Sequence, residues 1–587
     1  MEREIQMTRR GLFLCALSAC LLLGYHDPTQ EVPKLTPEKK KQEIPKPAYE
    51  VEVVVTNVQV VVRDKAGGPV TGLKPENFRI YEDNRLQKVS NFFEVKGMEV
   101  TFPVPEKKPE EPPPPLTPVL RKFPHQGNKV IFYFDNSHLH PMNRNWSIDK
   151  LESFIRQNFL STGGPHQGQV VCLDQKITII QDFTSDPDLL MAAVKEVNRH
   201  SGGALLRTRT RDNLREELNQ LFGDFSRPER RAETYEEALS YARNYVEAEQ
   251  TELVYSLKSL QAFVDQLAGV EGRKILIYVS DGLPINPAEE VFSFLDQAYP
   301  VGGARSEALN YDATRFFKEL TAKCNMSEVT IYPINAQGLE TAMLSADKTE
   351  GWNTYSRGSG MVRPGSREKN DALRLMAQET GGLAIVNSNK INVDLGKISD
   401  DLNYFYSLGY VSLDRREGAY HTIRVELADV KEECDVRVRQ GYLWLSPEEK
   451  IREAVFSRLF LERMDNPMNI GIQVLPVEKI PLSEKRRLTL KILIPIKNLS
   501  LYQQNSEAVG QIKLYIFLMD AKGQISPCHE LSEEIKIPKQ DYEVALRSVY
   551  PYLAEMHVDP GQYTISLALR DIYGETVNYL QVQKAVD

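Results

Sequence analysis

The chain has 587 residues, which is too long for one hydrophobic core, so we expect several domains. Its 41% hydrophobic and 26% charged residues are the proportions of an ordinary globular protein. With 72 Lys and Arg against 81 Asp and Glu, the formal net charge is -9, and no basic block occurs that could follow a phosphate backbone, which argues against nucleic acid as a partner.

The first 25 residues have the features of an export signal. Arg9 and Arg10 precede an apolar run, Gly11–Gly24, that is too short to cross a bilayer as a mature helix. Within this run, the sequence Leu-Ser-Ala-Cys ending at Cys20 resembles the lipobox of bacterial lipoproteins. We therefore expect an exported protein of the periplasm or cell envelope, either with a lipid anchor at Cys20 or with a signal that is simply cleaved.

The four other cysteines outside the signal predict neither a zinc site nor a disulfide framework. They are Cys172, Cys324, Cys434 and Cys528. Their spacing is wide and includes no Cys-x-x-Cys pair. We expect isolated thiols, with a single disulfide as the alternative.

Two β-rich segments, one near the start of the chain and one well after its middle, are expected to pack together as one β-module. Residues 26–49 are a Pro- and Lys-rich tether, and residues 98–126 are a second Pro-rich linker. Between them, residues 50–97 alternate β-branched and polar side chains around turn residues, as strands do. Residues 420–445 alternate in the same way, and because a two-stranded ribbon alone is marginal in water, we expect them to complete the first β-module.

The longest predicted domain covers residues 127–412, where apolar strands alternate with helical stretches. This pattern predicts a doubly wound α/β domain with a mostly parallel sheet and helices on both faces. A charged helical insertion is expected at about 205–268 and a long Gly-, Ser- and Arg-rich loop at 338–366. A linking helix is expected at 447–464.

The last segment, residues 465–587, has short alternating strands separated by turns, which predicts an immunoglobulin-like β-sandwich. The expected fold class is thus multidomain, an α/β domain flanked by β-sandwich modules.

Motifs of known enzymes are not found in the sequence. There is no Gly-x-Ser-x-Gly, no His-Glu-x-x-His and no Walker loop, and Gly381-Gly382 lacks the rest of a dinucleotide fingerprint. Two arginine-rich stretches, Arg207–Arg211 and Arg227–Arg231, are most simply solvated helix faces, with a docking role as the alternative. We expect a protein that is not an enzyme.

A series of short segments follows a characteristic order. The segments are VTGLKPENFRIYEDNRLQKVSNF (Val70–Phe92), FDNSH (Phe134–His138), QDFTSD (Gln181–Asp186), GRKILIYVSDGL (Gly272–Leu283), IYPINAQGL (Ile331–Leu339), ETGGLAIVN (Glu379–Asn387), YFYSLGYVS (Tyr404–Ser412) and VRVRQGY (Val436–Tyr442). In combination they resemble a von Willebrand factor A (VWA) domain, and more narrowly the VWFA-related exported proteins of the acidobacterial type. Together the segments cover about residues 51–442, and the resemblance implies a VWA fold for the domain within this range, in a family described by fold more than by activity.

The resemblance also implies a metal site. The VWA site takes Asp-x-Ser-x-Ser after the first strand, a threonine from a later loop and an aspartate after the fourth strand, oxygen ligands of the kind that Mg²⁺ prefers. Asp135, Ser137 and Asp281 match three of these positions. Leu139 and Ala204 stand at the other two, and they have no side-chain oxygen.

The incomplete ligand set leaves two alternatives open. Mg²⁺ binds weakly, with Thr184, Thr208 or Thr210 as a substitute ligand, or no metal binds, and Asp135 and Asp281 cap backbone N–H groups at the strand ends. The nearby His138 and His140 lack a third metal ligand and are expected to be exposed loop residues.

Ligands of open α/β sheets sit beyond the carboxyl ends of the strands, where the 338–366 loop is also expected. In that loop, Trp352, Tyr355 and Arg357 are the expected partner-binding residues, since aromatic and arginine side chains are favoured interface anchors. We therefore expect an adhesion-type interaction protein of the envelope that binds a protein or a surface partner. An unrecognised envelope hydrolase and a purely structural envelope scaffold are the alternatives.

Overall fold

The computed structural model describes residues 55–97, 99–101, 127–160, 166–200, 202–223, 231–270, 272–299, 303–338, 364–388, 390–412, 416–430, 432–461, 465–504 and 506–586. The expected signal, the tether and most of the 98–126 linker lie outside these residues, as do Cys20, Trp352, Tyr355 and Arg357. Within the described ranges, no helix has both the length and the apolar character needed to cross a membrane.

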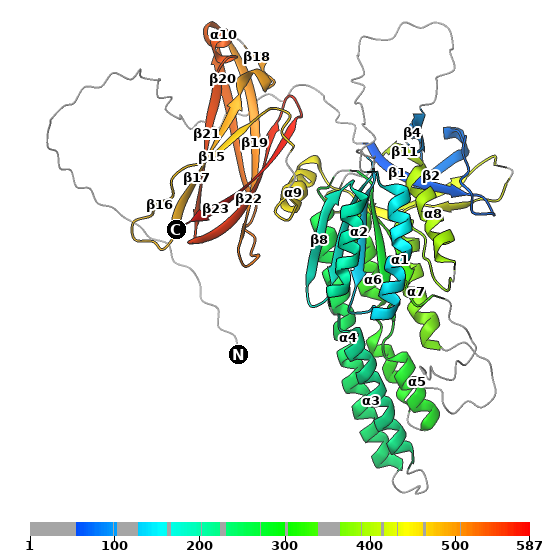
Figure 1. The fold of residues 1–587 in the computed structure, drawn as a ribbon. Coiled ribbons are helices and arrows are strands. Elements are labelled where there is room, and N and C mark those ends of the chain that lie inside the picture. Colours follow the sequence, from blue (N-terminus) through cyan, green and yellow to red (C-terminus); the bar gives the residue numbers. More distant parts are fainter. Residues whose placement is uncertain are drawn as a thin grey trace, which may run out of the picture. The chain divides into compact units, whose positions relative to one another are not determined.

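A five-stranded sheet lies at the centre of the α/β domain (Figure 1). In chain order its strands are β6 (Lys129–Asp135), β7 (Gln167–Leu173), β8 (Ile177–Thr184), β9 (Lys274–Ser280) and β10 (Val329–Asn335). The spatial order is β10-β9-β6-β7-β8, all parallel except β8. Ile385 adds a parallel bridge to Ile334 beyond β10. This is the strand order of a doubly wound sheet, so the expected α/β fold is confirmed.

The one antiparallel strand has a local cause. Only residues 174–176 separate β7 from β8, and so short a connection can join antiparallel neighbours but cannot cross over to a parallel one. The other strands are separated by helices, which permits parallel pairing.

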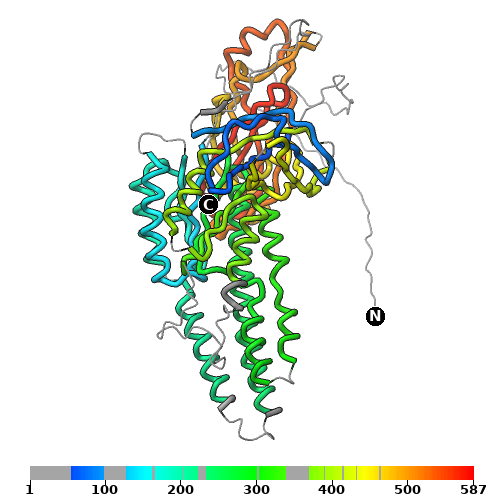
Figure 2. Tube along the Cα trace, turned by 90° about the vertical axis from the view of Figure 1, so that its right-hand side faces the viewer, coloured from blue at the N-terminus to red at the C-terminus, as the bar shows by residue number. Residues whose placement is uncertain are grey.

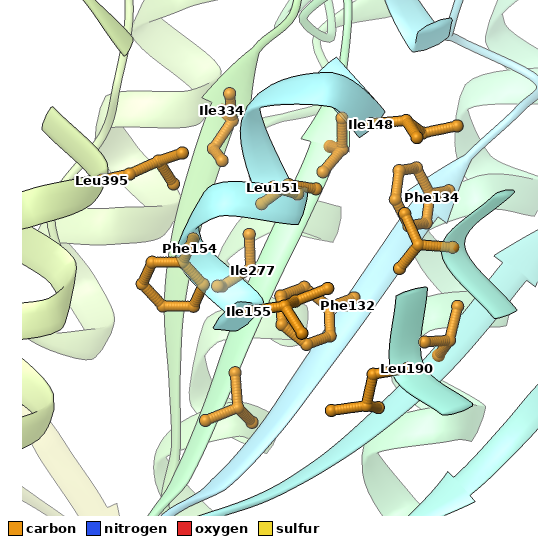
Figure 3. Packing of buried hydrophobic residues seen from close by; sticks show 14 of the residues in the cluster. Phe132, Phe134, Ile148, Leu151, Phe154, Ile155, Leu190, Ile277, Ile334 and Leu395 are labelled. Atoms are coloured by element: carbon orange, nitrogen blue, oxygen red, sulfur yellow. The ribbon is translucent and has the colours of Figure 1, made fainter. Parts of the chain in front are cut away.

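The apolar strands are buried on both faces, as parallel sheets require. Val130, Phe132 and Phe134 of β6 pack against the helices on one face (Figure 3). These helices are α1 (Pro141–Asn158), α2 (Pro187–Glu196), which continues into the 3-10 turn η2 (Val197–Arg199), and α8 (Ile391–Asn403). Ile131 and Tyr133 point to the opposite face. That face is covered by part of α4 (Arg231–Leu267), by α6 (Thr314–Met326) and by α7 (Pro364–Thr380).

The expected helical insertion consists of α3 (Ala204–Gly223) and α4, which run on beyond the sheet (Figures 1 and 2). The second half of α4, including Leu253 and Leu257, packs on the sheet. The first half packs with α3, α5 (Glu289–Ala298) and the 3-10 helix η4 (Ala304–Tyr311) around a core of its own. We call α3, residues 231–250 of α4, α5 and η4 the helical subdomain. Its buried core residues are Leu214, Leu218, Ala238, Leu239, Ala242, Val246, Ala288, Val291, Phe292, Phe294, Leu295, Tyr299, Ala304 and Ala308.

Strands that precede the α/β domain in sequence and strands that follow it form one β-module. Its two sheets have the orders β13-β1-β11-β4-β5 and β14-β12-β2-β3. The elements are β1 (Val55–Arg63), the 3-10 turn η1 (Pro75–Asn77), β2 (Phe78–Glu82), β3 (Arg85–Gln87), β4 (Val89–Lys96), β5 (Glu99–Thr101), β11 (Tyr404–Val411), β12 (Tyr420–Leu427), β13 (Asp435–Arg437) and β14 (Gly441–Leu443). Val58 of β1 pairs with Leu408 of β11, and Ile80 of β2 with Val425 of β12. One core joins the two sheets. We call this the split β-module.

The position of β11 shows that the predicted C-terminal boundary of the α/β domain was wrong. The expected α/β range of 127–412 included it, but β11 lies between β1 and β4. Its alternate residues Tyr406, Leu408 and Tyr410 are buried in the core of the split β-module, and the ring of Tyr406 lies 5.1 Å from that of Phe78. An apolar alternation of this kind fits a strand with one face on a core, and here the second sheet of the split β-module supplies that core.

Helix α9 (Pro447–Ser457) leads to the C-terminal domain and is shorter than the predicted 447–464, because the chain turns at Arg458. The domain has two antiparallel sheets that share one core, which makes it a β-sandwich. One sheet consists of β15 (Gly471–Val474), β16 (Glu478–Lys479), β17 (Arg486–Pro495) and β21 (Val549–Val558). The other consists of β18 (Tyr502–Gln504), β19 (Glu507–Asp520), β20 (His529–Pro538), β22 (Gly561–Asp571) and β23 (Val577–Val586). Short helical turns are η5 (Ile496–Asn498), η6 (Lys539–Asp541) and α10 (Tyr542–Ala545).

Candidate functional site

The predicted site residues Asp135 and Asp281 lie at the same edge of the sheet. Asp135 is the last residue of β6, and Asp281 directly follows β9, its parallel neighbour. The two strand ends are joined by a hydrogen bond of 2.8 Å from the backbone N–H of Asp281 to the carbonyl oxygen of His138. We call this region the carboxyl edge.

The carboxylate of Asp135 is fully buried and surrounded by side-chain donors. Oδ2 accepts a hydrogen bond of 2.5 Å from the hydroxyl of Tyr278 and lies 3.0 Å from Nδ1 of His138, while Oδ1 accepts from Ser256 at 3.4 Å. Burial alone would raise the pKa of Asp135, but His138, Tyr278 and Arg207 outweigh that effect and leave the pKa below its ordinary value. Asp135 is therefore an ionised carboxylate with both oxygens already engaged.

Asp281 caps the first turn of α1. Its Oδ2 accepts from the backbone N–H of His140 at 2.8 Å and its Oδ1 from Nδ2 of Asn143 at 3.0 Å. Burial raises the pKa of Asp281 to about 6, although these hydrogen bonds and the charge of Lys369 oppose the rise. Of the two aspartates, Asp281 contacts a backbone N–H at a helix start, whereas Asp135 contacts side chains.

The other oxygen ligands considered for a metal do not converge on Asp135. The hydroxyl of Ser137 donates to the carbonyl oxygen of Asp174 at 3.3 Å. Leu139 is 1% exposed and packs in the core on the α1 face of the sheet, whereas Tyr278, the partner of Asp135, belongs to the core on the α4 face.

The three candidate threonines are committed elsewhere. Thr208 and Thr210 donate to the carbonyl oxygens of Ala204 and Leu206 in their own helix, each at 3.0 Å. The hydroxyl of Thr184 accepts from the backbone N–H of Asp186 at 3.1 Å. No cluster of three or more His, Cys, Asp or Glu side chains suited to a metal ion occurs in the part of the chain that the structure describes. The residues present do not fit an open Mg²⁺ site, and we derive no step through a metal ion.

The expectation that His138 is exposed was wrong. Its side chain is buried, because α4 covers it and places the hydroxyl of Ser256 3.2 Å from Nδ1. His140, which is half-buried, forms the N-cap of α1, where its Nδ1 accepts from the backbone N–H of Met142 at 3.3 Å. Both imidazoles therefore have structural contacts with neighbouring helices.

An ion pair that the sequence did not indicate completes the carboxyl edge. Arg207 of α3 was expected on a solvated helix face, but its Nε donates to Glu249 of α4 at 3.1 Å, its Nη2 also pairs with Glu249, and its Nη1 donates to the carbonyl oxygen of Ser137 at 3.1 Å. Burial raises the pKa of Glu249, but Arg207 and His138 outweigh this effect and lower it. Arg207 and Glu249 are 42 residues apart on two helices, so no local pattern could reveal the pair.

Ser256, His138 and Asp135 bring together the residue types of a hydrolytic triad, but not its geometry. In such a triad the histidine uses one ring nitrogen for the serine and the other for the aspartate. Here Nδ1 of His138 is the atom near both partners, and among the described residues Nε2 has no hydrogen-bond partner. Ser256 is 2% exposed, so its hydroxyl is buried between α4 and the sheet. The trio links α4 to the sheet, because Ser256 of α4 contacts both Asp135 and His138.

The comparisons with known proteins give structural likenesses only. No family model matches the sequence, and no match to a curated protein is found. Among solved structures, a conserved hypothetical protein BatB from Bacteroides thetaiotaomicron is 12% identical over 47% of this chain and 98% of its own, with a TM-score of 0.22. An aerotolerance-related membrane protein from Bacteroides fragilis is 11% identical over 47% of this chain and 99% of its own, with a TM-score of 0.22.

A third likeness is proximal thread matrix protein 1 from the mussel byssus, whose structure has a zinc-occupied MIDAS motif. It is 14% identical over 49% of this chain and 48% of its own, with a TM-score of 0.23, so this chain spans about half the length of the mussel protein. At these TM-scores, none of the three bears on function. The strand order of the sheet and its helices on both faces make the α/β domain VWA-like in fold.

Proposed function

We propose that this chain is an exported, non-catalytic binding protein of the cell envelope, and that its VWA-like domain contacts a protein or surface partner at the carboxyl edge. The observation that carries the proposal is the helical subdomain, which stands with its own core where an open α/β sheet binds its ligands. A separately packed insertion at that position enlarges the surface available to a partner.

The exposed side chains of the helical subdomain support this role. Leu205 and Leu206 in the first turn of α3 are 48% and 69% exposed, and Leu309 of η4 is 78% exposed. The adjacent Leu205 and Leu206 offer exposed apolar surface that a partner could bury. Trp352, Tyr355 and Arg357 remain the proposed anchors of the neighbouring loop, because the chain leaves the sheet for that loop at the same edge, after β10.

Export and anchoring form a separate part of the proposal. The arginines and the apolar run before residue 25 support cleavage at or near Cys20. Mass spectrometry of the native N-terminus tests it: a diacylglyceryl adduct on Cys20 supports the lipid anchor, an unmodified mature N-terminus supports simple cleavage, and an intact Met1 contradicts export.

The binding role is tested with the immobilised mature chain and envelope extract. After a captured partner is purified, its affinity is measured for the wild type, for Leu205→Ser/Leu206→Ser and for Trp352→Ala/Tyr355→Ala. Leu482→Ser, which changes a fully exposed leucine of the C-terminal domain, is the matched control. We expect both double variants to lose affinity by roughly tenfold or more and the control to keep it. If both double variants keep the wild-type affinity, the partner binds at a face other than the carboxyl edge.

A further inference from the structure

The strand ends at the carboxyl edge contribute two carboxylates, and helix α4 contributes a third. Asp135 ends β6, Asp281 follows β9, and Glu249 belongs to α4. The three carboxylates share neighbouring cationic groups, since Arg207 acts on Asp135 and Glu249, and Lys369 acts on Glu249 and Asp281. The permanent cations that act on them come from the surrounding helices, Arg207 from α3 and Lys369 from α7. In a buried region of low dielectric, such a group of carboxylates needs counter-charges to stay ionised.

Arg207 has the geometry of a fixed counter-charge. Its guanidinium reaches both sides of the edge, donating to the carbonyl oxygen of Ser137 in the loop after β6 and to Glu249 on α4. Only 24% of its side chain is exposed, and 13% of that of Glu249. A planar guanidinium held by two groups in this way keeps one orientation, unlike a flexible surface arginine.

The chain that enters α3 is held against the sheet just before Arg207. A Cβ atom at Gly202 would lie 1.7 Å from the carbonyl oxygen of Asn136, so glycine alone permits this approach. The carbonyl oxygen of His200 accepts from Nδ2 of Asn136 at 2.9 Å and from Nη1 of Arg144 at 2.8 Å. The start of α3 is thereby fixed to β6 and α1, and with it the position of Arg207.

We propose that Arg207 supplies at the carboxyl edge the positive charge that a divalent cation would otherwise provide, so that α3 is a permanent part of this edge and the domain works without a metal ion. The proposal takes the carboxyl edge as the binding face from the proposed function, but its test needs no partner. Arg207 is a positioning residue here, since it acts through Ser137 and Glu249.

The direct partners of Asp135 agree with this assignment. A divalent ion at Asp135 would have to displace the hydroxyl of Tyr278 or the imidazole of His138, both within 3.0 Å of Oδ2. It would also approach the guanidinium of Arg207, which already lowers the pKa of Asp135 by its charge. Losing donors and meeting a like charge both disfavour the ion, since Mg²⁺ gives up its waters reluctantly.

The test is the thermal unfolding of the mature chain in MgCl₂, MnCl₂ or EDTA. We expect the Tm of the wild type to be the same in all three. Arg207→Ala should lower Tm by roughly 5 °C or more, because it leaves Glu249 without its ion-pair partner and removes one of the positive charges that act on Asp135. Arg209→Ala removes an equal charge from an exposed position of the same helix and should leave Tm nearly unchanged.

A cation response distinguishes a counter-charge from ordinary packing. In Arg207→Ala, millimolar MgCl₂ or MnCl₂ should raise Tm by about 2 °C or more, because the uncompensated carboxylates then attract the ion. Arg207→Lys should restore most of the wild-type Tm and abolish that response. If Arg207→Ala does not fold, Arg207→Gln, which keeps a donor for Ser137 but no charge, takes its place.

Two results would overturn the inference. A rise of the wild-type Tm with Mg²⁺ or Mn²⁺ that EDTA reverses would show a working metal site. If Arg207→Ala or Arg207→Gln shows no change of Tm with Mg²⁺ or Mn²⁺, the role of Arg207 is packing and not that of a counter-charge. Neither result depends on whether a partner binds, so the proposed function can fail or succeed independently.

Discussion

Arg437 and Asp401 form a bidentate ion pair across two parts of the fold, with hydrogen bonds of 2.7 Å from Nη1 to Oδ2 and 3.0 Å from Nη2 to Oδ1. Asp401 lies near the end of α8 in the α/β domain and is fully buried, while Arg437 belongs to β13 of the split β-module. Arg63 of β1 donates to the same carboxylate from Nε at 3.0 Å, and the hydroxyl of Tyr332 on β10 at 3.1 Å. One buried carboxylate thus joins the two parts.

The first prediction is that Asp401→Asn destabilises the chain by about 3–5 kcal/mol, because Arg63 and Arg437 are left buried without their counter-charge. Asp400→Asn is the comparison, since it removes an equal charge from a neighbouring side chain that is 44% exposed and lies 3.5 Å from Arg63, where a loss of about 1 kcal/mol or less is expected. Urea unfolding followed by tryptophan fluorescence measures both. Equal stabilities of the two variants would show that the buried pair adds little.

The second prediction concerns pH and Glu453 of α9. This helix packs closely on the end of α4: a Cβ at Gly269 would lie 2.3 Å from Cα of Ala454, and the backbone N–H of Gly269 donates to Ser457 at 2.8 Å. Burial raises the pKa of Glu453 to about 7. The charges of Asp265 and Glu449 add to this rise, while those of Lys323 and Lys274 oppose it.

The pKa of Glu453 is higher in the folded chain than the 4.5 of a free glutamate, so its contribution to stability is fully present below pH 4.5 and is lost as the pH rises through about 7. Glu453→Gln, which stays neutral, should therefore gain stability over the wild type on the order of 2 kcal/mol above pH 7 and none below pH 4.5. Glu448→Gln, an exposed acid of the same helix, is the control. Parallel pH profiles for wild type and Glu453→Gln would refute the assignment.

The sheet of the α/β domain was predictable because its strands are continuous apolar runs, such as residues 130–134, that end in a polar residue. This local pattern gives both the buried strand and the place of Asp135 at its end. The surroundings of Asp135 were not predictable in the same way. Ser256, Tyr278 and Arg207 come from distant elements, and only the packing of α3 and α4 over the edge brings them together.

Strand β21 shows a different limit of sequence patterns. Pro551 interrupts its alternation, and proline in a run normally argues against a strand. Among the described strands, β21 pairs with β17 alone, so it is an edge strand, where a missing N–H is tolerated. The packing of the whole sandwich places β21 at the edge of its sheet, and the residues of this strand alone do not predict that position.

The third prediction tests the contact at the start of α3. In Gly202→Ala the new methyl group would collide with the backbone of Asn136, so α3 must shift, at a cost of about 1–3 kcal/mol. The adjacent Gly203 is a matched control, because a methyl group there would meet no described atom within 4 Å. Gly203→Ala should therefore change stability by no more than about 0.5 kcal/mol. Chemical denaturation measures the free energy of unfolding of both variants. Equal values would show that the start of α3 can shift away from Asn136 at little cost.

The last prediction is that restoring the two missing oxygen ligands does not restore metal binding. In Leu139→Ser/Ala204→Thr, every oxygen type of the VWA metal motif is present in the sequence. Residue 139, however, packs on the α1 face of the sheet, while the partners of Asp135 lie on the α4 face, so the new serine hydroxyl points into the wrong core. The oxygens of Asp135 also keep their donors Tyr278, His138 and Ser256.

We expect isothermal titration of this double variant with MgCl₂ or MnCl₂ to show no binding, and its Tm to fall because a buried leucine is lost, at a cost of about 2–5 kcal/mol. Leu139→Ala/Ala204→Val, which carries neither new oxygen, is the matched control for the lost packing, and it should respond to the cations no differently. Adding Arg207→Ala to the restored pair should be the step that introduces a cation response, because it removes the competing charge. Saturable Mg²⁺ binding by Leu139→Ser/Ala204→Thr with Arg207 intact would mean that the two missing oxygens, and not the built-in guanidinium, keep the ion away.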